Sequence, residues 1–543
     1  MSQSPSPRPF SASMRVEHLE HMACEWFDIL IIGGGITGTA AARDAALRGY
    51  TVALIEKEDF ASGTSSRSSR LIHGGLRYLE HYQFGLVGES VAERARLLRN
   101  AARVVKPLTF IYPVYRRRYP PYRLLSLGLW LYDLMSIRGG RGTPVHRMLR
   151  SQQLAQVEPL IVTPDVAGAG HYYDATANDA RLTLLTAKAA HHAGAITANY
   201  AEAVGLLKAG NKVMGAQVRD VLANNAIEVK ARAVVNAAGP WVDRVLGLDA
   251  AAGRPMLRPT KGAHLIVPRE KLPVEHGIVL RSRCDNRAMF VIPWGDFTLI
   301  GTTDTDYAGP LEEVAAAQAD CAYLLECVHD LMPEARVDEP DVISAYAGVR
   351  PLIAANDGSP SAVSREHAMV ESQSGLITIA GGKLTTHRAM AEQLVDRVQT
   401  KLLRDFGMPP KASSRTPNLP LAAPGEIVLP DLPEKVARHL VEAYGADLAK
   451  VLRLGANEPI VSGLPYLRAE AAYAVEHEMA MTLCDFMMRR THLMYETNDG
   501  ALLQAGLIAA DMGARLGWDD ARMQHEMAVY EKQVMRARAF RNG

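Results

Sequence analysis

The sequence predicts an α/β nucleotide-binding domain, an antiparallel β substrate domain and an all-α C-terminal domain. Three observations lead to this fold class. A glycine fingerprint follows a short apolar run near the N-terminus. Between Pro255 and Gly301, apolar segments are separated by turn residues without helical periodicity, whereas helical periodicity dominates from Pro433 to Gly543. Because 543 residues are too many for one compact core, we expect roughly two to four domains.

The fingerprint reads FDILIIGGGITG and covers residues 27–38. Its apolar, β-branched part, Ile29 to Ile32, predicts a strand that is buried on both faces. Gly33, Gly35 and Gly38 then fill the pattern G-x-G-x-x-G. The first glycine permits a tight turn, the second lets the backbone approach a pyrophosphate, and the third lets helix and strand pack closely.

The residues after the fingerprint complete a βαβ unit. The segment TAAARDAALRG predicts a helix whose N-terminal amides face the phosphates. A second strand ends at Glu56, 18 residues after Gly38, where a carboxylate would bind the ribose hydroxyls of an adenosine. The unit therefore predicts a bound dinucleotide. It leaves NAD, NADP and FAD open, and Glu56 disfavours only the form with a 2′-phosphate.

The composition is that of an ordinary globular enzyme, with 48% hydrophobic and 22% charged residues. Sixty basic residues against 59 acidic residues argue against a dedicated nucleic-acid binder, whose field would be strongly positive. The five cysteines lack C-x-x-C spacing, so we expect free thiols and no metal site. No apolar run approaches the roughly 20 residues that span a bilayer.

The first 26 residues carry no motif. The stretch MSQSPSPRPFSASMR has no apolar region of the kind that secretory signals contain. Its serine, proline and arginine content is faintly similar to that of a transit peptide, but Glu17, Glu20 and Glu25 follow soon after. We therefore expect residues 1–26 to form a disordered leader.

Later segments predict how the domains alternate along the chain. A short buried strand, Ala233 to Asn236, belongs with the first strands in one parallel sheet. The segment LITIAGGKLTTHRAM resumes strand, glycine turn and helix, so the nucleotide-binding domain is discontinuous. The predicted boundaries are 27–105, 165–250 and 345–405 for the nucleotide-binding domain, 106–164 and 251–344 for the substrate or cap domain, 406–432 for a Pro/Ser-rich linker, and 433–543 for the helical domain.

Two glycine-rich segments are candidates for ligand contact. The first, SSRSSRLIHGGLRY, runs from Ser65 to Tyr78 and offers hydroxyls, amides and a His-Gly-Gly step that a flat ring could approach. For any single residue of this segment, the alternative to ligand contact is a place in a solvated surface loop. For the segment as a whole, ligand contact is favoured. The second, AGGKLTTHRA, opens a helix at residues 380–389, and its dipole would stabilise the charge of a reduced flavin ring. An ordinary helix start is the alternative there.

Four cations lie beside glycine turns or strand ends and are candidate anion ligands: Arg77, Arg350, Arg365 and Lys383. His264, in TKGAHLIVP, alternates with strand residues and could face a pocket, although a lone histidine is more often structural. The segment from Arg116 to Met135 combines basic, aromatic and apolar residues. Both an interfacial membrane contact and a helix that packs its apolar face inward fit this composition.

Taken together, the motifs closely resemble those of the FAD-dependent, membrane-associated aerobic glycerol-3-phosphate dehydrogenases. The resemblance covers nearly the whole chain from Phe27 onward. Its most specific parts are DILIIGGGITG, TSSRSSRLIHGGLRYLEHY, DARL, VVNAAGPW, TKGAHLIVP, FVIPW followed by IGTTDTDY, GVRPL and GGKLTT. It implies an FAD-binding domain of the two-dinucleotide, glutathione-reductase-like type together with an antiparallel substrate domain and a helical cap.

The resemblance also implies an activity. Such an enzyme oxidises sn-glycerol 3-phosphate to dihydroxyacetone phosphate with hydride transfer to FAD N5, and it then passes electrons to membrane quinone. We expect a homodimer in the cytoplasm, peripherally associated with the inner face of the cell membrane through residues 116–135, with no nucleic-acid partner. A glycerol-3-phosphate oxidase that uses O₂ is the first alternative. A non-catalytic, FAD-stabilised assembly module is the second.

The resemblance assigns roles to individual residues. FAD contacts are expected at Gly33, Gly35, Gly38, Glu56, Ser65, Ser66, His73, Gly74, Gly75, Gly382 and Leu384. Substrate contacts are expected at Arg77, Arg350, Arg365, Lys383 and Thr385. The general base is left open: His264 is the first choice and His73 the second, while Lys383 could act if burial lowered its pKa.

Overall fold

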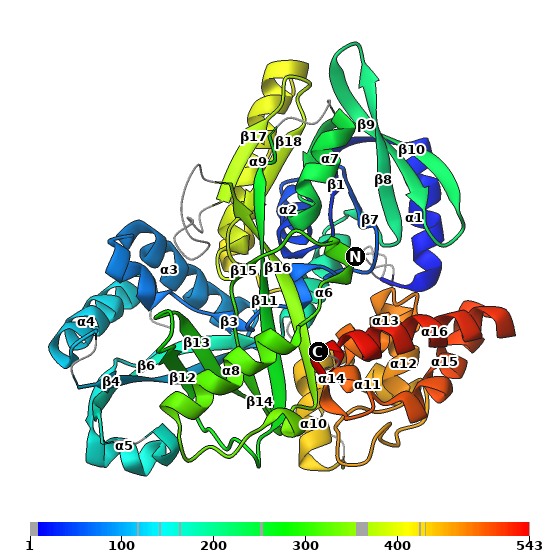
Figure 1. Cartoon of the computed structure of the whole chain (residues 1–543). Coiled ribbons are helices and arrows are strands. Elements are labelled where there is room, and N and C mark those ends of the chain that lie inside the picture. The colour runs from blue at the N-terminus through cyan, green and yellow to red at the C-terminus, as the bar shows by residue number, and fades with distance from the viewer. Residues whose placement is uncertain are drawn as a thin grey trace.

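The computed structural model describes residues 9–116, 119–140, 143–161, 164–249, 254–354, 367–422, 425–428 and 431–541 (Figure 1). Two sheets and a set of C-terminal helices make up this part of the chain. Sheet A has the order β17-β18-β10-β1-β2-β7, and a hairpin of β8 and β9 extends from β10. Its strands are β1 (Trp26–Ile32), β2 (Val52–Ile55), β7 (Ile196–Ala198), β8 (Ala201–Ala209), β9 (Lys212–Asp220), β10 (Asn225–Asn236), β17 (His367–Glu371) and β18 (Ile377–Gly381).

The central strands of sheet A are parallel. Strand β1 pairs with β10 on one side and with β2 on the other, in a register that places Ile29 opposite Ala233 and Ile32 opposite Asn236. This confirms that the strand Ala233–Asn236 joins the first strands in one parallel sheet. Strand β17 is antiparallel to β18, so the sheet as a whole is mixed.

Both faces of sheet A are covered, which explains the unbroken apolar run in β1. Ile29 and Ile31 contact alanines of α2 (Ile36–Leu47), beside α6 (Asp179–His192) and α9 (His387–Phe406). Leu30 and Ile32 point to the opposite face and pack with residues of α1 (Ala12–Cys24) and the β8–β9 hairpin. Alternate residues of one strand thus contribute to two separate cores.

The N-terminal region contains a helix where we expected a disordered leader. Helix α1 (Ala12–Cys24) begins at Ser11, whose hydroxyl accepts a hydrogen bond from the Met14 amide at 3.2 Å. Leu19 and Met22 are buried in the core beneath sheet A. The expectation of disorder is therefore wrong for residues 9–26, because apolar side chains at helical spacing dock on the sheet. Residues 1–8 lie outside the described part.

Sheet B has the order β15-β11-β14-β13-β12-β4-β6-β3, with β16 paired to β11 and β5 paired to β6. All of its pairs are antiparallel except β12 with β4, so this sheet is mixed too. Its strands are β3 (Leu71–Ile72), β4 (Val105–Tyr115), β5 (Arg147–Arg150), β6 (Val166–Ala177), β11 (Leu257–Pro268), β12 (Gly277–Arg281), β13 (Ala288–Trp294), β14 (Phe297–Gly301), β15 (Thr305–Asp306) and β16 (Ser344–Ile353).

Three strands of sheet B differ from the predicted boundaries. Strands β3, β6 and β16 fall almost wholly in the ranges 27–105, 165–250 and 345–405 that we assigned to the nucleotide-binding domain, but β3 pairs with β6, β6 with β4, and β16 with β11. Sequence periodicity identifies a strand without showing which sheet it joins. The chain therefore crosses between the two sheets more often than the pattern of strands and helices in the sequence indicated.

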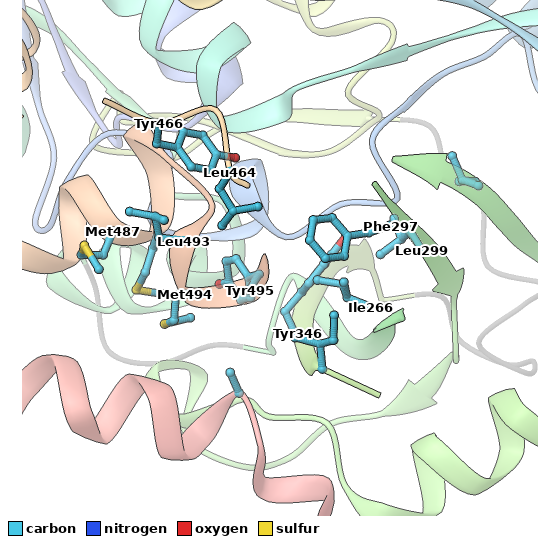
Figure 2. Close-up of a cluster of buried hydrophobic side chains, with 14 of the residues drawn as sticks. Ile266, Phe297, Leu299, Tyr346, Leu464, Tyr466, Met487, Leu493, Met494 and Tyr495 are labelled. Carbon is cyan, nitrogen blue, oxygen red and sulfur yellow. The ribbon is translucent and has the colours of Figure 1, made fainter. Parts of the chain in front are cut away.

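Helices cover both faces of sheet B. Helices α5 (Ser151–Val157) and α8 (Gln318–Leu331) pack on one face, and α3 (Phe84–Asn100) and α4 (Tyr122–Arg138) on the other. On the second face, Ile266, Leu299 and Tyr346 of the sheet share a core with Leu493, Met494 and Tyr495 of the C-terminal region (Figure 2). The C-terminal helices are α10 (Glu434–Tyr444), α11 (Leu448–Arg453), α12 (Ala469–Glu478), α13 (Leu483–Asp485), α14 (Leu493–Glu496), α15 (Leu502–Leu516) and α16 (Asp520–Arg536).

The segment 116–135 contains most of α4, and this helix has two apolar faces. Leu125, Leu129 and Tyr132 are buried against sheet B. Leu127 and Trp130 are 67% and 66% exposed. The inward packing is therefore present, and an apolar surface remains on the other side. Of the helices in the described ranges, none is both long enough and apolar enough to cross a membrane.

The predicted linker, 406–432, lies against the nucleotide-binding domain over part of its length. The Arg43 guanidinium of α2 donates hydrogen bonds to the carbonyls of Leu419 and Pro420 at 2.9 and 2.8 Å. The hydroxyl of Ser414 donates to Asp44 at 2.5 Å. These contacts fix the path by which the chain reaches α10.

Candidate active site

Two adjoining cavities lie where the sheets meet. The first has a volume of 460 Å³ and is lined by the fingerprint turn, the end of β2 and the second glycine turn. The second has a volume of 450 Å³ and is lined by the Ser-rich loop and by β11, β13 and β16 of sheet B. Both cavities share lining residues, namely Thr64, Ser68, Pro351, Gly382, Lys383 and Leu384. They therefore form one elongated site.

The fingerprint glycines shape the first cavity. Gly33 has φ of +117°, and a Cβ atom there would lie 2.5 Å from the carbonyl oxygen of Ala237. A Cβ atom on Gly38 would clash with the carbonyl of Gly33, so this glycine lets α2 pack on the turn. Gly35 is the N-cap of α2, and the Ser65 hydroxyl accepts a hydrogen bond from the Ile36 amide at 3.0 Å. The local geometry is that of an anion-binding helix start.

Glu56 lies at the end of β2 in the first cavity. Its carboxylate accepts hydrogen bonds from the amides of Gly34 and Glu58 at 2.6 and 3.0 Å. Burial raises the pKa of Glu56 to about 7, because the charged form is poorly solvated there. The acceptor is thus held beside the glycine turn, where the sequence predicted a ribose contact.

The second glycine turn lies between the two cavities. Gly381 and Gly382 have φ of +78° and +84°, a backbone conformation that side chains disfavour. Leu384 follows them and lines both cavities. The Lys383 ammonium lies 3.8 Å from the centre of the Tyr78 ring and 3.5 Å from the Ser90 hydroxyl. The turn thus places backbone amides and one cation at the junction.

The structure brings most of the predicted residues together. Gly33, Gly35, Glu56 and Ser65 line the first cavity, Gly382, Lys383 and Leu384 line both, and His73, Gly75, Arg77, His264, Arg350 and Thr385 line the second. Gly38, Ser66 and Gly74 line neither of them. Arg365 lies outside the described residues.

Gly74 and Thr385 stabilise the loops around the second cavity. The Gly74 amide donates to the Tyr132 hydroxyl at 2.9 Å, and a Cβ atom on Gly74 would clash with Tyr132. The glycine is therefore required by packing against α4. The Thr385 hydroxyl lies 3.1 Å from the His73 amide and 3.3 Å from its carbonyl, so it ties the second glycine turn to the Ser-rich loop.

His264 is the buried histidine of the second cavity, with 2% of its surface exposed. Its Nε2 atom lies 2.8 Å from the Ser69 hydroxyl, and its ring stacks on that of Tyr346. Burial, and then the charges of Arg350 and Arg70, lower the pKa of His264 to about 3. The imidazole is therefore neutral across the physiological range.

Arg350 is placed near His264 by the pairing of β11 with β16. His264 pairs with Tyr346, and two positions along both strands Gly262 pairs with Gly348. The Arg350 guanidinium lies over Gly262, since a Cβ atom on that residue would clash with it. Two residues of a strand span about 7 Å, so the cation and the imidazole share one face with a glycine pair between them.

The guanidinium of Arg350 is also held by the loop after β14. It donates to the Asp304 carboxylate and the Thr302 hydroxyl, both at 3.0 Å, and to the Thr303 carbonyl at 3.1 Å. These contacts fix the orientation of the planar guanidinium group. One fixed cation and one neutral base around a glycine-lined space suit a small molecule that carries both an anionic group and a hydroxyl.

Several of these residues were missed in the sequence. Ser69 belongs to the Ser-rich string but was not singled out, and Tyr346 reaches His264 only through strand register. Alternation in SAYAGVRPL would have placed Tyr346, Gly348 and Arg350 on one face. The Thr302–Asp304 loop lies within the motif IGTTDTDY, but none of its residues was assigned a role.

The cavities fit FAD. A glycine turn opens a helix, a carboxylate lies at the ribose position, and a second glycine turn stands where the first cavity meets the second. Within the described ranges, no group of histidine, cysteine and carboxylate side chains could hold a metal ion.

Comparison with known proteins agrees with this geometry. The model of the FAD dependent oxidoreductase family matches residues 28–397, and that of the C-terminal domain of alpha-glycerophosphate oxidase matches residues 372–523. A glycerol-3-phosphate dehydrogenase of Mycobacterium leprae is 37% identical over 540 residues, which cover 95% of this chain and 89% of the relative. An aerobic glycerol-3-phosphate dehydrogenase of Bacillus subtilis is 35% identical over 541 residues, with 95% and 96% covered.

A solved structure gives the same result. The glycerol-3-phosphate dehydrogenase from Bacillus halodurans, complexed with FAD, superposes with a TM-score of 0.77 at 29% identity and covers 97% of this chain and 98% of its own. The resemblance drawn from the motifs is thereby confirmed. The chain belongs to the FAD-dependent oxidoreductase family, and within it to the FAD-dependent glycerol-3-phosphate dehydrogenases, with FAD as its cofactor.

Proposed function

We propose that the protein oxidises sn-glycerol 3-phosphate to dihydroxyacetone phosphate. FAD bound along the two cavities supplies the hydride acceptor. The observation that carries the proposal is the position of the Arg350 guanidinium over Gly262, two strand residues from His264. A three-carbon phosphate monoester can bridge this separation, with its phosphate on the cation and its C2 hydroxyl at the imidazole. The relatives named as glycerol-3-phosphate dehydrogenases support the same substrate.

The phosphate is proposed to bind to Arg350 together with Arg77 and Lys383, which line the same cavity. A phosphate dianion needs several fixed cations, and each charge-assisted hydrogen bond contributes about 1.5–3 kcal/mol. Thr385 positions the loop beside them through the His73 backbone. Arg365 is proposed as a further ligand on its sequence motif alone.

His264 is the proposed general base. Its ring is neutral, it lines the second cavity, and Ser69 and Tyr346 fix its orientation. His73 lines the same cavity and is the second choice. Lys383 is the third choice, because the Tyr78 ring under its ammonium stabilises the charged form, which cannot accept a proton. In each case the residue would take the C2 hydroxyl proton as hydride leaves C2.

The proposed acceptor of the electrons is a membrane quinone. Leu127 and Trp130 form an exposed apolar surface on α4 within residues 116–135, and Arg123 lies on the same helix. This composition suits an anionic membrane surface. We propose that the protein is a peripheral membrane homodimer in the cytoplasm, built on an FAD domain of the two-dinucleotide, glutathione-reductase-like type with a substrate domain on sheet B.

A glycerol-3-phosphate oxidase is the alternative function, favoured by the match of residues 372–523 to the C-terminal domain of alpha-glycerophosphate oxidase. Stopped-flow reoxidation of the substrate-reduced protein distinguishes the two. The dehydrogenase proposal predicts fast reaction with a quinone analogue and slow reaction with O₂. The reverse result would establish the oxidase.

The substrate proposal is tested by anaerobic flavin reduction across a panel of polyol phosphates. We expect sn-glycerol 3-phosphate to bleach the oxidised flavin fastest and unphosphorylated glycerol to leave it yellow. If no member of the panel bleaches correctly loaded FAD, the protein is a non-catalytic flavoprotein scaffold and the proposal fails.

A further inference from the structure

A third cavity lies between sheet B and the C-terminal helices. Its volume is 630 Å³, and it shares no lining residue with the two cavities of the active site. Its walls come from the start of β4, the turn between β13 and β14, helix α10 and the residues around His492. The proposed function assigns no role to this space, although it is large enough for a small-molecule ligand.

Positive charge dominates the lining of the third cavity. Eight arginine and lysine residues face four carboxylates. One of these carboxylates is Glu496, and burial raises its pKa to about 7, so near neutral pH its negative charge is only partly present. Arg181 and Arg490 are paired with the buried Glu478 and Asp59 outside the lining. Lys106, Arg269 and Lys435 pair with the other three lining carboxylates, and Arg438 pairs with Glu434. Arg103 and Arg70 are left as the lining cations that could attract an anion.

Arg103 is the clearest sign that an anion belongs there. It is half-buried in the lining, and among the residues described it has neither an ion pair nor a side-chain hydrogen bond. Burial, followed by the repulsion of Arg181, lowers the pKa of Arg103, and the attraction of Asp447 and Glu478 offsets this only in part. A charge that is withdrawn from water without a partner is costly, and a bound anion would supply the partner.

Arg70 is a second cation of this kind in the lining. It is 5% exposed, and its guanidinium lies 3.8 Å from the centre of the Trp294 ring. Its terminal nitrogens are 3.5 Å from the ring nitrogens of His492, and its Nε atom has no hydrogen-bond partner in the described structure. No carboxylate lies within ion-pair distance of Arg70 among the residues described. The cavity thus has a buried cation beside an aromatic ring, and the charges of Asp179 and Glu496 act on it only from beyond ion-pair distance.

We propose that the third cavity binds a small molecule through a phosphate or pyrophosphate group, held by Arg103 and Arg70. The planar fork of arginine matches these groups in bidentate geometry. Arg70 directly follows Ser69, whose hydroxyl contacts His264, so the occupant would lie next to the loop that orients the catalytic imidazole. The group can come from a soluble phosphate ester or from the head group of an anionic lipid.

The test is calorimetric titration of inorganic pyrophosphate into the FAD-loaded protein. We expect a saturable site besides any binding in the substrate cavity, and Arg103→Gln, which removes a charge-assisted contact, should weaken this site about 10- to 100-fold. The matched control is Arg99→Gln, an exposed arginine of α3 that lines none of these cavities, and it should bind as wild type does. Arg350→Gln should keep this site and lose only the pyrophosphate that enters the substrate cavity, which that residue lines.

Three results would overturn the proposal: no saturable heat, equal affinity in Arg103→Gln and wild type, or loss of all binding in Arg350→Gln alone. Because Arg103 has no partner to lose, Arg103→Gln should keep its FAD content and Tm. Should it misfold, Arg70→Gln, which removes the other proposed ligand, replaces it, with the same expected loss. Sedimentation with phosphatidylglycerol vesicles separates the sources: a lipid head group predicts that Arg103→Gln releases the protein, and a soluble ester predicts no change.

Discussion

The imidazole of His264 stacks on the phenol ring of Tyr346, with ring centroids 4.8 Å apart and planes inclined by 22°. The two residues are direct partners across β11 and β16. The Tyr346 hydroxyl donates to the carbonyl of Ser68 at 2.8 Å, and the Ser69 hydroxyl meets His264 Nε2. The strand pair β11–β16 and the loop at Ser68 and Ser69 thus hold His264, the proposed base. Because this packing buries the imidazole, it also keeps the imidazole neutral.

The buried neutral His264 predicts a pH dependence of stability. Its folded pKa, about 3, lies below the usual value, so the unfolded state binds more protons between pH 3 and about 6.5. This contribution to stability is complete above pH 6.5 and is lost as pH falls. At pH 5 the loss is about 2 kcal/mol. Urea unfolding at pH 7 and pH 5 should therefore show a smaller acid loss in FAD-loaded His264→Gln than in wild type. Equal losses would contradict the assignment.

Arg350→Gln should lower kcat/KM for sn-glycerol 3-phosphate about 30- to 150-fold while FAD is retained. The variant removes the guanidinium group that is proposed to hold the phosphate. Arg258→Gln is the matched control, because this arginine of β11 pairs with the exposed Asp306. Its kcat/KM should stay within about twofold of wild type. An unchanged value in Arg350→Gln would remove this residue from the phosphate site.

The sequence predicted the nucleotide-binding half of the site well, because its chemistry is encoded locally. Gly33, Gly35 and Glu56 lie within one βαβ unit, and each occupies the position that the motif required. The surroundings of His264 could not be predicted in this way. Tyr346 reaches it through strand register, and Arg350 is oriented by Asp304, whose motif IGTTDTDY does not show that the two side chains meet.

Two fold predictions failed for a related reason. The leader was judged from its serine and proline content, whereas Leu19 and Met22 dock on a sheet that forms from distant segments. Strands β6 and β16 were assigned to a domain by their place in the chain, whereas their hydrogen-bond partners lie in sheet B. Both outcomes depend on tertiary contacts that local patterns do not contain.

Arg15→Gln should destabilise the protein by about 3 kcal/mol. Arg15 of α1 forms a buried ion pair with Asp220 at 2.5 Å, and its removal leaves a buried carboxylate unpaired. The control, Arg219→Gln, breaks the more exposed pair with Glu202 and should cost less than about 1 kcal/mol. Denaturant unfolding of both variants measures the difference. Equal values would mean that α1 contributes little to the folded domain.

Replacing Leu127 and Trp130 by serine should release the protein from anionic vesicles without lowering turnover with a soluble dye. Both side chains are exposed on α4, whereas Leu129 is buried and its replacement would disturb the core. Leu503→Ser on α15 is the control, because this leucine is 88% exposed and lies elsewhere. Vesicle binding that persists in the double variant would exclude α4 as the membrane contact.

The central claim is that one site joins a phosphate-binding arginine to a proton-accepting histidine beside FAD. It is tested most directly by the rate of anaerobic flavin bleaching after rapid mixing with sn-glycerol 3-phosphate. We predict fast bleaching in wild type and at least about tenfold slower bleaching in both Arg350→Gln and His264→Gln, with FAD fully retained. Wild-type rates in both variants, or no bleaching of the loaded wild-type protein, would contradict the claim.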